Sequence, residues 1–342
     1  MQAQRRVGSA RAAATSMVSF ASFIAAALMA LTPLQLAHAQ DWPAEGRNIR
    51  LIVPSPGGGG TGDTIARVMA EEIGKRLKAN FVVDNKGGAN GNIGATAAAQ
   101  APADGYHFLF SWAGTLAVNA AMYKQMGYDS QRDFVPIVLV ADVPNILVVN
   151  NELPVKSLED FTRHAKANPG RLSYGSTGIG SSMHLAGEFY MREFGVQMVH
   201  VPFSNPGNAT TNLISGEIQL MFQLVPGIAS QVKAGRVRAI GVMARERSPA
   251  LPEVPTTAEL GAPQLLSSTW FALLAPKGAP AAALERMNAV ANEALADPAV
   301  KKRLNELGAS PLGGTAKQLA EHLAAEIDKW GRLVREAKIQ VQ

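Results

Sequence analysis

The stretch Pro54-Ser55-Pro56-Gly57-Gly58-Gly59-Gly60-Thr61-Gly62-Asp63-Thr64 joins a strand-like apolar run at residues 49–53 to a strongly patterned helix. Its four consecutive glycines allow the backbone to approach a ligand without interfering side chains. The helix start presents free N–H groups and about half a unit of positive charge, which suits an anion. We therefore predict an anion-binding site in this strand–loop–helix unit, with Ser55, Gly57, Gly58, Gly59, Gly60 and Thr61 as candidate contacts.

The anion is better interpreted as a carboxylate than as a phosphate. Gly57-x4-Gly62-Asp63-Thr64 has the spacing of a G-x-x-x-x-G-K-[ST] phosphate loop, but Asp63 stands where the lysine belongs. A carboxylate at that position would repel a terminal phosphate. The simplest role for Asp63 is the N-cap of a helix beginning at Thr64, and contact with the ligand is the alternative.

The N-terminal 39 residues have the features of a secretory signal peptide. Arg5, Arg6 and Arg11 form a basic segment, residues 18–31 are apolar, and Ala37-His38-Ala39 matches a cleavage site. The apolar run is shorter than the roughly 20 residues of a membrane-spanning helix. We expect residues 1–39 to be cleaved and the mature chain to be exported.

Composition excludes several classes of function. Three of the 32 Lys and Arg residues lie in the signal segment, which leaves 29 against 27 acidic residues and a net charge of +2. No basic run resembles a nucleic-acid patch, so nucleic acid is not expected as a partner. The chain has no cysteine, which excludes disulfides and thiol nucleophiles, and its six histidines lack metal-ligand spacing. We expect no metal and no cofactor.

Strand and helix patterns alternate along the chain, which predicts an α/β fold with a largely parallel sheet. About 300 residues after cleavage favour two lobes. Each half contains a strand, a loop rich in Gly, Ser or Thr, and a helix start, at residues 54–64 and 175–182. Ligands in open α/β sheets lie at the carboxyl ends of the strands, so two such loops facing each other would form a clamp.

The second loop, residues 174–184, reads YGSTGIGSSMH and places four hydroxyls ahead of an apolar helix. Hydroxyls donate to carboxylate oxygens, and the helix start adds backbone N–H groups. A capped helix with a solvated loop is the alternative, since Ser and Thr favour such positions. The matching loop in the first half favours ligand contact. The candidates are Ser176, Thr177, Gly180, Ser181, Ser182 and His184.

An exported serine hydrolase is the rival interpretation of this loop. No G-x-S-x-G elbow occurs, because Gly175 directly precedes Ser176 and Gly180 directly precedes Ser181. His184 is too close in sequence to these serines for good alignment at a helix start. It is either a ligand donor or a packed, hydrogen-bonded residue, and we predict no enzymatic activity.

Several ordered motifs together resemble one protein family. The sequence contains, in this order, PSPGGGGTGDTIAR (54–67), DNKGGANGNIGA (84–95), PADGY (102–106), YGSTGIGSSMHLAGE (174–188), SPALPEVPTTAELG (248–261), TWFALLAPKGAP (269–280) and ADPAVKKRLNELGASPLGGT (296–315). With these motifs the chain is similar to the periplasmic substrate-binding receptors of the tripartite tricarboxylate transporter family, the Bug receptors, over essentially its whole mature length.

The resemblance implies a two-lobed periplasmic-binding-protein fold. Each lobe would be a mostly parallel sheet flanked by helices, and two strands near residues 137–149 and 270–275 would cross between the lobes. Lobe 1 would comprise residues 40–142 plus 270–342, and lobe 2 residues 143–269. Family ligands are small carboxylates or amino acids, and the two loops typically grip one carboxylate.

Three departures from the family pattern surround the expected cleft. The first loop is one glycine longer, and Ser55 replaces a frequent aromatic residue. The V-P-Y-K-G segment reads Val201-Pro202-Phe203-Ser204-Asn205, and M-F-D reads Met221-Phe222-Gln223. The neutral Gln223 weakens the case for an amino-acid ligand. Trp112, Phe203 and Gln223 are the candidates for the distal end of the ligand, with core packing as the alternative for each.

The resemblance implies a monomeric receptor that captures a small organic carboxylate in the periplasm and delivers it to the membrane subunits of a secondary transporter. A receptor that signals to a sensor kinase is the alternative of the same binding class. The ligand is left open among dicarboxylates, tricarboxylates, aromatic acids and amino acids.

Overall fold

The structure is a computed structural model that describes residues 42–58 and 60–336. The expected signal peptide and Gly59 lie outside these residues. Within the described residues, no helix combines the length and apolarity that a membrane crossing requires.

The described strands form one mixed sheet in the order β2-β1-β3-β9-β4-β7-β5-β6, with β8 and β10 also paired to β4. Their bounds are β1 Ile49–Val53, β2 Phe81–Asn85, β3 His107–Trp112, β4 Phe134–Asn150, β5 Ser173–Ser176, β6 Val199–Pro202, β7 Leu220–Leu224, β8 Val237–Val242, β9 Ser268–Pro276 and β10 Ser310–Pro311.

Helices connect these strands. Their bounds are α2 Thr61–Leu77, η1 Ala89–Gly91, α3 Asn92–Ala99, η2 Gly114–Val118, α4 Asn119–Met122, α5 Leu158–Ala167, α6 Ser182–Phe194, α7 Pro206–Ser215, α8 Val225–Lys233, α9 Ala281–Ala296, α10 Pro298–Glu306 and α11 Ala316–Glu336.

Strand direction separates the βα units from the two long strands that link them. β1 pairs in parallel with β2 and β3, and β5 pairs in parallel with β6 and β7. Every pair that includes β4 or β9 is antiparallel. The α/β architecture is therefore as predicted. The sheet is mixed, because the linking strands run against their neighbours.

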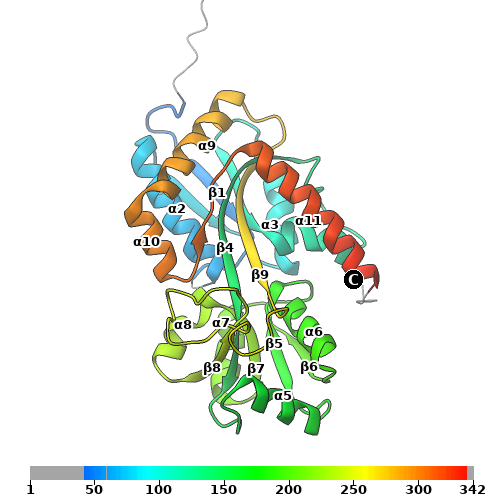
Figure 1. The fold of residues 1–342 in the computed structure, drawn as a ribbon. Helices are drawn as coiled ribbons and strands as arrows, with labels where there is room; N and C mark the ends of the chain where they lie inside the picture. The colour runs from blue at the N-terminus through cyan, green and yellow to red at the C-terminus, as the bar shows by residue number, and fades with distance from the viewer. Residues whose placement is uncertain (1–41, 59, 337–342) are drawn as a thin grey trace, which may run out of the picture. The chain divides into compact units, whose positions relative to one another are not determined.

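Strand β4 changes partners along its length. Phe134–Pro144 pairs with β9, side by side in Figure 1, whereas Asn145–Asn150 pairs with β7 and β8. The change occurs at Asn145, which is fully buried. Its Nδ2 donates to the Phe222 carbonyl at 2.8 Å, and its Oδ1 accepts from Ser267 Oγ at 3.0 Å. This side chain therefore supplies hydrogen bonds where the regular ladder is interrupted.

Helix α2 illustrates how the sequence pattern builds the core. Its apolar face, comprising Ile65, Val68, Met69, Ile73 and Leu77, is buried. These positions repeat with the helical period, so one stripe packs on the sheet and the opposite stripe faces solvent. The packing fixes the direction of α2 and therefore the place of its N-terminus.

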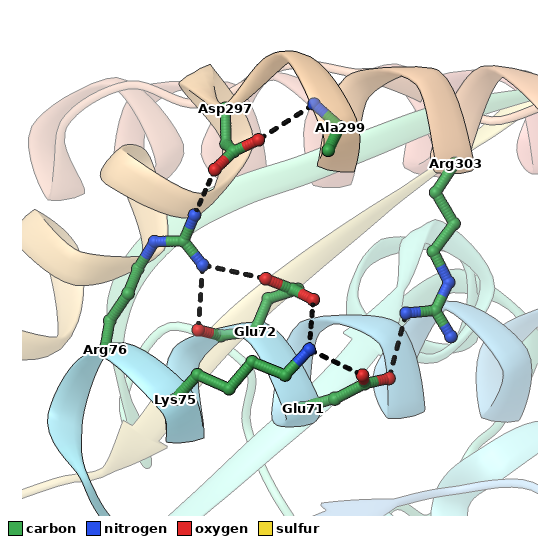
Figure 2. A network of polar contacts seen from close by, with 7 residues as sticks. All are labelled: Glu71, Glu72, Lys75, Arg76, Asp297, Ala299 and Arg303. Atoms are coloured by element: carbon green, nitrogen blue, oxygen red, sulfur yellow. Dashed lines mark hydrogen bonds and ion pairs between the residues drawn. The ribbon is translucent and has the colours of Figure 1, made fainter.

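A polar network joins α2 to α10, although they lie more than 200 residues apart in sequence (Figure 2). Arg76 donates to Asp297 at 2.7 Å, and Arg303 donates to Glu71 at 2.9 Å. Asp297 also caps α10 by accepting from the Ala299 N–H. Most of these side chains are partly exposed, so the network aligns the helices more than it stabilises them.

Candidate functional site

A pocket of about 310 Å³ lies between the loops that connect strands to helices in the two halves of the sheet. Residues from α2, the loop of η1, α6 and the β6–α7 segment reach it, as do residues at the ends of β7 and β9. No charged residue is among the lining residues in the part of the chain that the structure describes. An anion in this pocket would therefore depend on backbone dipoles and neutral donors.

The N-terminus of α2 opens onto the pocket through Gly60, Thr61 and Gly62. Gly60 occupies the N-cap position in an extended conformation, and no side chain caps the helix. The first N–H groups of a helix have no partner within the helix. Without a side-chain cap, those of α2 can bind an anion. The predicted backbone anion site is therefore compatible with the geometry.

Asp63 does not cap α2, because the helix begins at Thr61 and not at the expected Thr64. It lies in the first turn and is buried. Its carboxylate accepts from Gly58 N–H at 3.1 Å, Arg67 Nε at 3.0 Å and Asn85 Nδ2 at 2.9 Å. The hydrogen bond from Gly58 therefore joins Asp63 to the glycine loop. The Asp63 oxygens already accept from three donors.

Burial raises the pKa of the Asp63 carboxyl, but hydrogen bonds from Arg67, Gly58 and Asn85 outweigh burial and hold the pKa below its usual range. The ionised Asp63 carboxylate contributes its full stabilisation of the folded state above the unfolded-state pKa of about 3.9. That stabilisation is lost as pH falls through the lower folded-state pKa. Asp63 therefore remains ionised at neutral pH.

Replacement of Asp63 by asparagine should lower the free energy of unfolding by about 2 kcal/mol, because charge-assisted hydrogen bonds are lost. Urea unfolding at pH 7 measures this change. Asp328→Asn on α11 is the matched control: its exposed pair with Arg332 should contribute less than about 0.5 kcal/mol. Equal effects of the two substitutions would contradict this role for Asp63.

The second loop supplies the start of α6. Ser181 is the N-cap, and its hydroxyl accepts from the His184 N–H at 3.3 Å and donates to the Gly178 carbonyl at 2.8 Å. Thr177, Ser181 and Ser182 line the pocket. The capping interpretation is therefore confirmed for Ser181, and ligand contact by the residues of this loop that line the pocket stays a prediction.

Ser176 and His184 lie behind this loop and do not line the pocket. Ser176 Oγ lies 2.6 Å from His200 Nε2, and the His184 and His200 rings are 4.3 Å apart. His184 Nδ1 accepts from the Gly180 N–H at 3.2 Å. Burial lowers the pKa of both histidines to about 4, so both are neutral at pH 7. They brace the loop as packed, hydrogen-bonded residues.

Asn90 was missed as a site residue, although its glycine-rich motif was noted. It lines the pocket with positive φ (49°), flanked by Ala89 and Gly91. Its carbonyl accepts from Thr115 Oγ1 and Asn119 Nδ2, and its Nδ2 donates to Asn119 Oδ1 at 2.8 Å. The dipeptide Asn90-Gly91 is a turn signal that could have identified this third loop.

Aromatic residues and two buried polar residues complete the pocket. Trp112, Phe203 and Gln223 all line it, as predicted for the distal end, and Tyr123, Thr269 and Phe271 join them. The Trp112 and Phe271 rings are 6.0 Å apart, and Gly62 packs on Trp112. Apolar walls therefore surround a small number of hydrogen-bonding groups, which is typical of small-molecule sites.

The structure brings most of the predicted site residues together. Those that line the pocket are Ser55, Gly60, Thr61, Trp112, Thr177, Ser181, Ser182, Phe203 and Gln223. Those in the described part of the chain that do not line it are Gly57, Gly58, Asp63, Ser176, Gly180 and His184. Gly59 lies outside the described residues. Contact with a ligand stays a prediction for all of them.

Two comparisons with protein sequences show what the chain resembles. The model of the family described as "Tripartite tricarboxylate transporter family receptor" matches residues 65–339. The chain is 38% identical to the UPF0065 protein in the tcbD–tcbE intergenic region of Pseudomonas sp. strain P51, with 86% of this chain and 87% of that protein covered. It is 36% identical to protein BugT of Bordetella pertussis, with 87% and 91% covered.

Solved structures show the same fold. Rpa4515 of R. palustris, solved with adipate, is 34% identical with a TM-score of 0.84, and the match covers 88% of this chain and 100% of that chain. MatC of Rhodopseudomonas palustris, solved with malate, is 29% identical with a TM-score of 0.78, covering 85% and 100%. The predicted α/β binding-protein fold is confirmed, and the relatives are solute-binding receptors rather than enzymes. The chain belongs to the tripartite tricarboxylate transporter receptor family.

Proposed function

We propose that this protein is a periplasmic receptor that binds a small organic carboxylate in the pocket between the two sheet halves. The observation that carries the proposal is the meeting of two helix starts, α2 and α6, at a pocket without charged side chains among the described residues. Backbone N–H groups and the hydroxyls of Thr61, Thr177 and Ser182 would hold the carboxylate. The adipate and malate named for two solved neighbours support this class of ligand.

The lobes that would close on the ligand are residues 40–142 plus 270–342, and residues 143–269. The change of partners of β4 at Asn145 supports a hinge there, since strand pairing differs on its two sides. Close approaches between residues of the two proposed lobes support closure. A Cβ added to Gly60 would lie 3.4 Å from Pro206, and a Cβ added to Gly180 would lie 3.3 Å from Asn90. Hinged closure around a ligand is common in two-lobed receptors.

A hydrolase that uses Ser181 lacks support in the geometry of the second loop, and Ser176, whose Oγ lies 2.6 Å from His200 Nε2, is buried and does not line the pocket. The Ser181 hydroxyl is engaged by the Gly178 carbonyl and the His184 N–H, while His184 Nδ1 accepts from Gly180. No described imidazole nitrogen is positioned to take a proton from Ser181. Ester substrates should therefore give no turnover that depends on Ser181.

We propose that the receptor acts as a monomer and delivers its ligand to the membrane subunits of a tripartite secondary transporter. The description of its family as a transporter receptor supports the delivery role. A receptor that feeds a sensor kinase would share the same pocket. Uptake of labelled ligand by cells that lack this receptor separates the two roles. Transport predicts lost uptake, whereas signalling predicts unchanged uptake with altered gene expression.

Thermal unfolding of the purified mature chain tests the carboxylate proposal. A panel of mono-, di- and tricarboxylates should contain ligands that raise the melting temperature in a concentration-dependent way, because a ligand that binds only the folded state stabilises it. Amines and sugars of similar size serve as controls and should give no shift. A panel without any shift from a carboxylate would overturn the proposal.

A further inference from the structure

A small apolar cluster joins the two proposed lobes beside the pocket. Its buried members are Val118, Met122 and Val334, which belong to the first lobe, and Leu185, which belongs to the second. We call these four residues the interlobe cluster. Their exposed fractions lie between 0% and 7%. Separation of the lobes would return these side chains to water, so their burial favours the closed arrangement.

The C-terminal helix carries part of this cluster. Helix α11 packs on η2 and α4 in the first lobe, and Val334 lies in its last turn. Trp330, one turn earlier, packs against the same cluster. Leu185 meets these residues from the start of α6 in the second lobe. The end of α11 therefore reaches a helix of the opposite lobe.

The interlobe cluster lies between two hollows of the surface. Tyr123 and Ile179 pack against it and line the ligand pocket. Leu185 and Trp330 line a second hollow of about 1270 Å³. The four residues of the cluster do not line the ligand pocket themselves. A substitution in the cluster therefore changes how the lobes meet without removing a group from the pocket wall.

In the first lobe, one short segment carries both cluster residues and a support of the pocket. Asn119 lies between Val118 and Met122 in the chain and is fully buried. Its Oδ1 accepts from Asn90 Nδ2 at 2.8 Å, and its Nδ2 donates to the Asn90 carbonyl at 3.1 Å. Asn90 lines the pocket. The position of this pocket loop is therefore tied to the segment that meets the second lobe.

In the second lobe, the cluster also adjoins a pocket loop. The Leu185 N–H donates to the carbonyl of Ser181, the N-cap of α6, at 3.0 Å. A Cβ added to Gly180 would lie 3.5 Å from Met122 Cγ and 3.3 Å from Asn90 Nδ2. Loops of the two lobes therefore approach each other next to the interlobe cluster.

We infer that the interlobe cluster is a latch that keeps a population of the free receptor closed and thereby sets its affinity for the ligand. This inference rests on the proposed closure of the two lobes and adds positioning residues that lie outside the pocket. Affinity falls in proportion to the fraction of molecules in the binding-competent state. Because the pocket is complete only when the lobes are closed, weakening the latch should lower affinity, mainly by faster dissociation.

Val334→Ala tests the latch from the side of α11. Labels on cysteines introduced by Lys302→Cys in the first lobe and Lys166→Cys in the second report the distance between the lobes, because both positions are exposed and the chain has no cysteine of its own. Without ligand, part of the labelled protein should show the interlobe distance of this structure. Val334→Ala should reduce that closed population at least threefold. Affinity for the best carboxylate of the panel should fall by a similar factor.

Val290→Ala is the matched control. Val290 is fully buried on α9, which packs on α2 and α10 within the first lobe. The substitution removes the same atoms from a core that does not join the lobes, so it should lower the melting temperature but leave the closed population and the affinity unchanged. A closed population that Val334→Ala does not reduce, or an affinity loss that Val290→Ala reproduces, would overturn the latch.

A double-mutant cycle with Leu185→Ala tests whether residues of the two lobes act through one contact. Val334→Ala and Leu185→Ala each disrupt the same cluster, so the double variant should lose much less affinity than the product of the two single losses. A loss equal to that product would show that the two residues act independently and that they form no shared latch.

The outcomes separate this inference from the proposed function. If carboxylates bind but Val334→Ala leaves the closed population unchanged, the latch is wrong and the carboxylate receptor stands. If no carboxylate of the panel binds, the proposed function fails, while the distances in the free protein still decide whether the cluster holds the lobes closed.

Discussion

Replacement of Gly94 by alanine is expected to lower the free energy of unfolding by about 3 kcal/mol and to weaken ligand binding strongly. Gly94 lies in α3, where a Cβ would be 2.6 Å from the Lys86 carbonyl oxygen and 2.6 Å from Pro54 Cα. These are backbone atoms, so no rotamer change relieves the overlap. The helix must move away from the loop that follows β1.

This displacement reaches the pocket directly, because Pro54 and Ser55 both line it. Urea unfolding and titration with the best carboxylate of the panel measure the two effects. Gly331→Ala is the control: its Cβ would meet only the end of the Arg335 side chain at 3.3 Å, which can rotate away. Because alanine favours a helix interior, this control should stabilise by up to about 1 kcal/mol. A loss below about 1 kcal/mol for Gly94→Ala would contradict the close packing of α3 on the loop.

Acidification is expected to destabilise the protein and open the second loop. Burial lowers the pKa of His184 to about 4, and burial together with the His184 ring lowers that of His200 to about 4. The unfolded chain has histidine pKa values near 6.5, so between about pH 4 and 6.5 it binds more protons than the folded chain. Stability is therefore full above about pH 6.5 and falls as pH decreases towards 4, by on the order of 3 kcal/mol.

The groups around the two imidazoles determine how protonation acts. Glu188 Oε1 lies 3.7 Å from His184 Nε2 and accepts from the Tyr174 hydroxyl at 2.7 Å, while the Tyr174 ring stacks on His200. The Glu188 carboxylate partly favours the protonated imidazoles, but it also accepts the hydrogen bond from the Tyr174 hydroxyl. Protonation of His184 Nδ1 removes the acceptor for Gly180 N–H, so ligand affinity should fall with stability.

The double variant His184→Asn, His200→Gln tests this mechanism. Asn Oδ1 can accept from Gly180 N–H in place of Nδ1, and neither amide titrates. The loss of stability between pH 7 and 4.5 should shrink by more than half relative to the unmodified protein. An undiminished acid transition in the double variant would show that other groups cause it.

The spacing of residues in the sequence was sufficient to predict elements that keep their apolar residues on one side. The apolar stripe of α2 and the box at Ser157, where the hydroxyl accepts from Asp160 N–H, follow directly from sequence spacing. The predicted start of α2, Thr64, lies three residues after the observed start, Thr61. The preference of Asp for N-cap positions suggested Asp63 as the cap, but its carboxylate accepts from Gly58 N–H and Arg67 Nε instead.

Contacts between distant strands account for the position of two predicted site residues, Ser176 and His184, behind the pocket lining. Tyr174 and His200 lie opposite each other in the β5–β6 pair, which brings His200 against His184 and Ser176. Sequence proximity to the hydroxyl loop suggested ligand contact for Ser176 and His184. Their engagement with His200 depends on a register that the local sequence does not encode.

Removal of a single backbone N–H at the start of α2 tests whether a carboxylate binds at the helix starts. Proline is tolerated at the first helical position, and Gly60 has the extended conformation that proline requires before it (φ −81°, ψ 151°). Thr61→Pro therefore removes one N–H while keeping α2, and Thr61→Ala removes the same side chain but keeps that N–H. Titration with the carboxylate of largest thermal shift compares the two variants. At equal stability, Thr61→Pro should bind the carboxylate at least tenfold more weakly than Thr61→Ala, and equal affinities would show that this N–H does not bind the carboxylate.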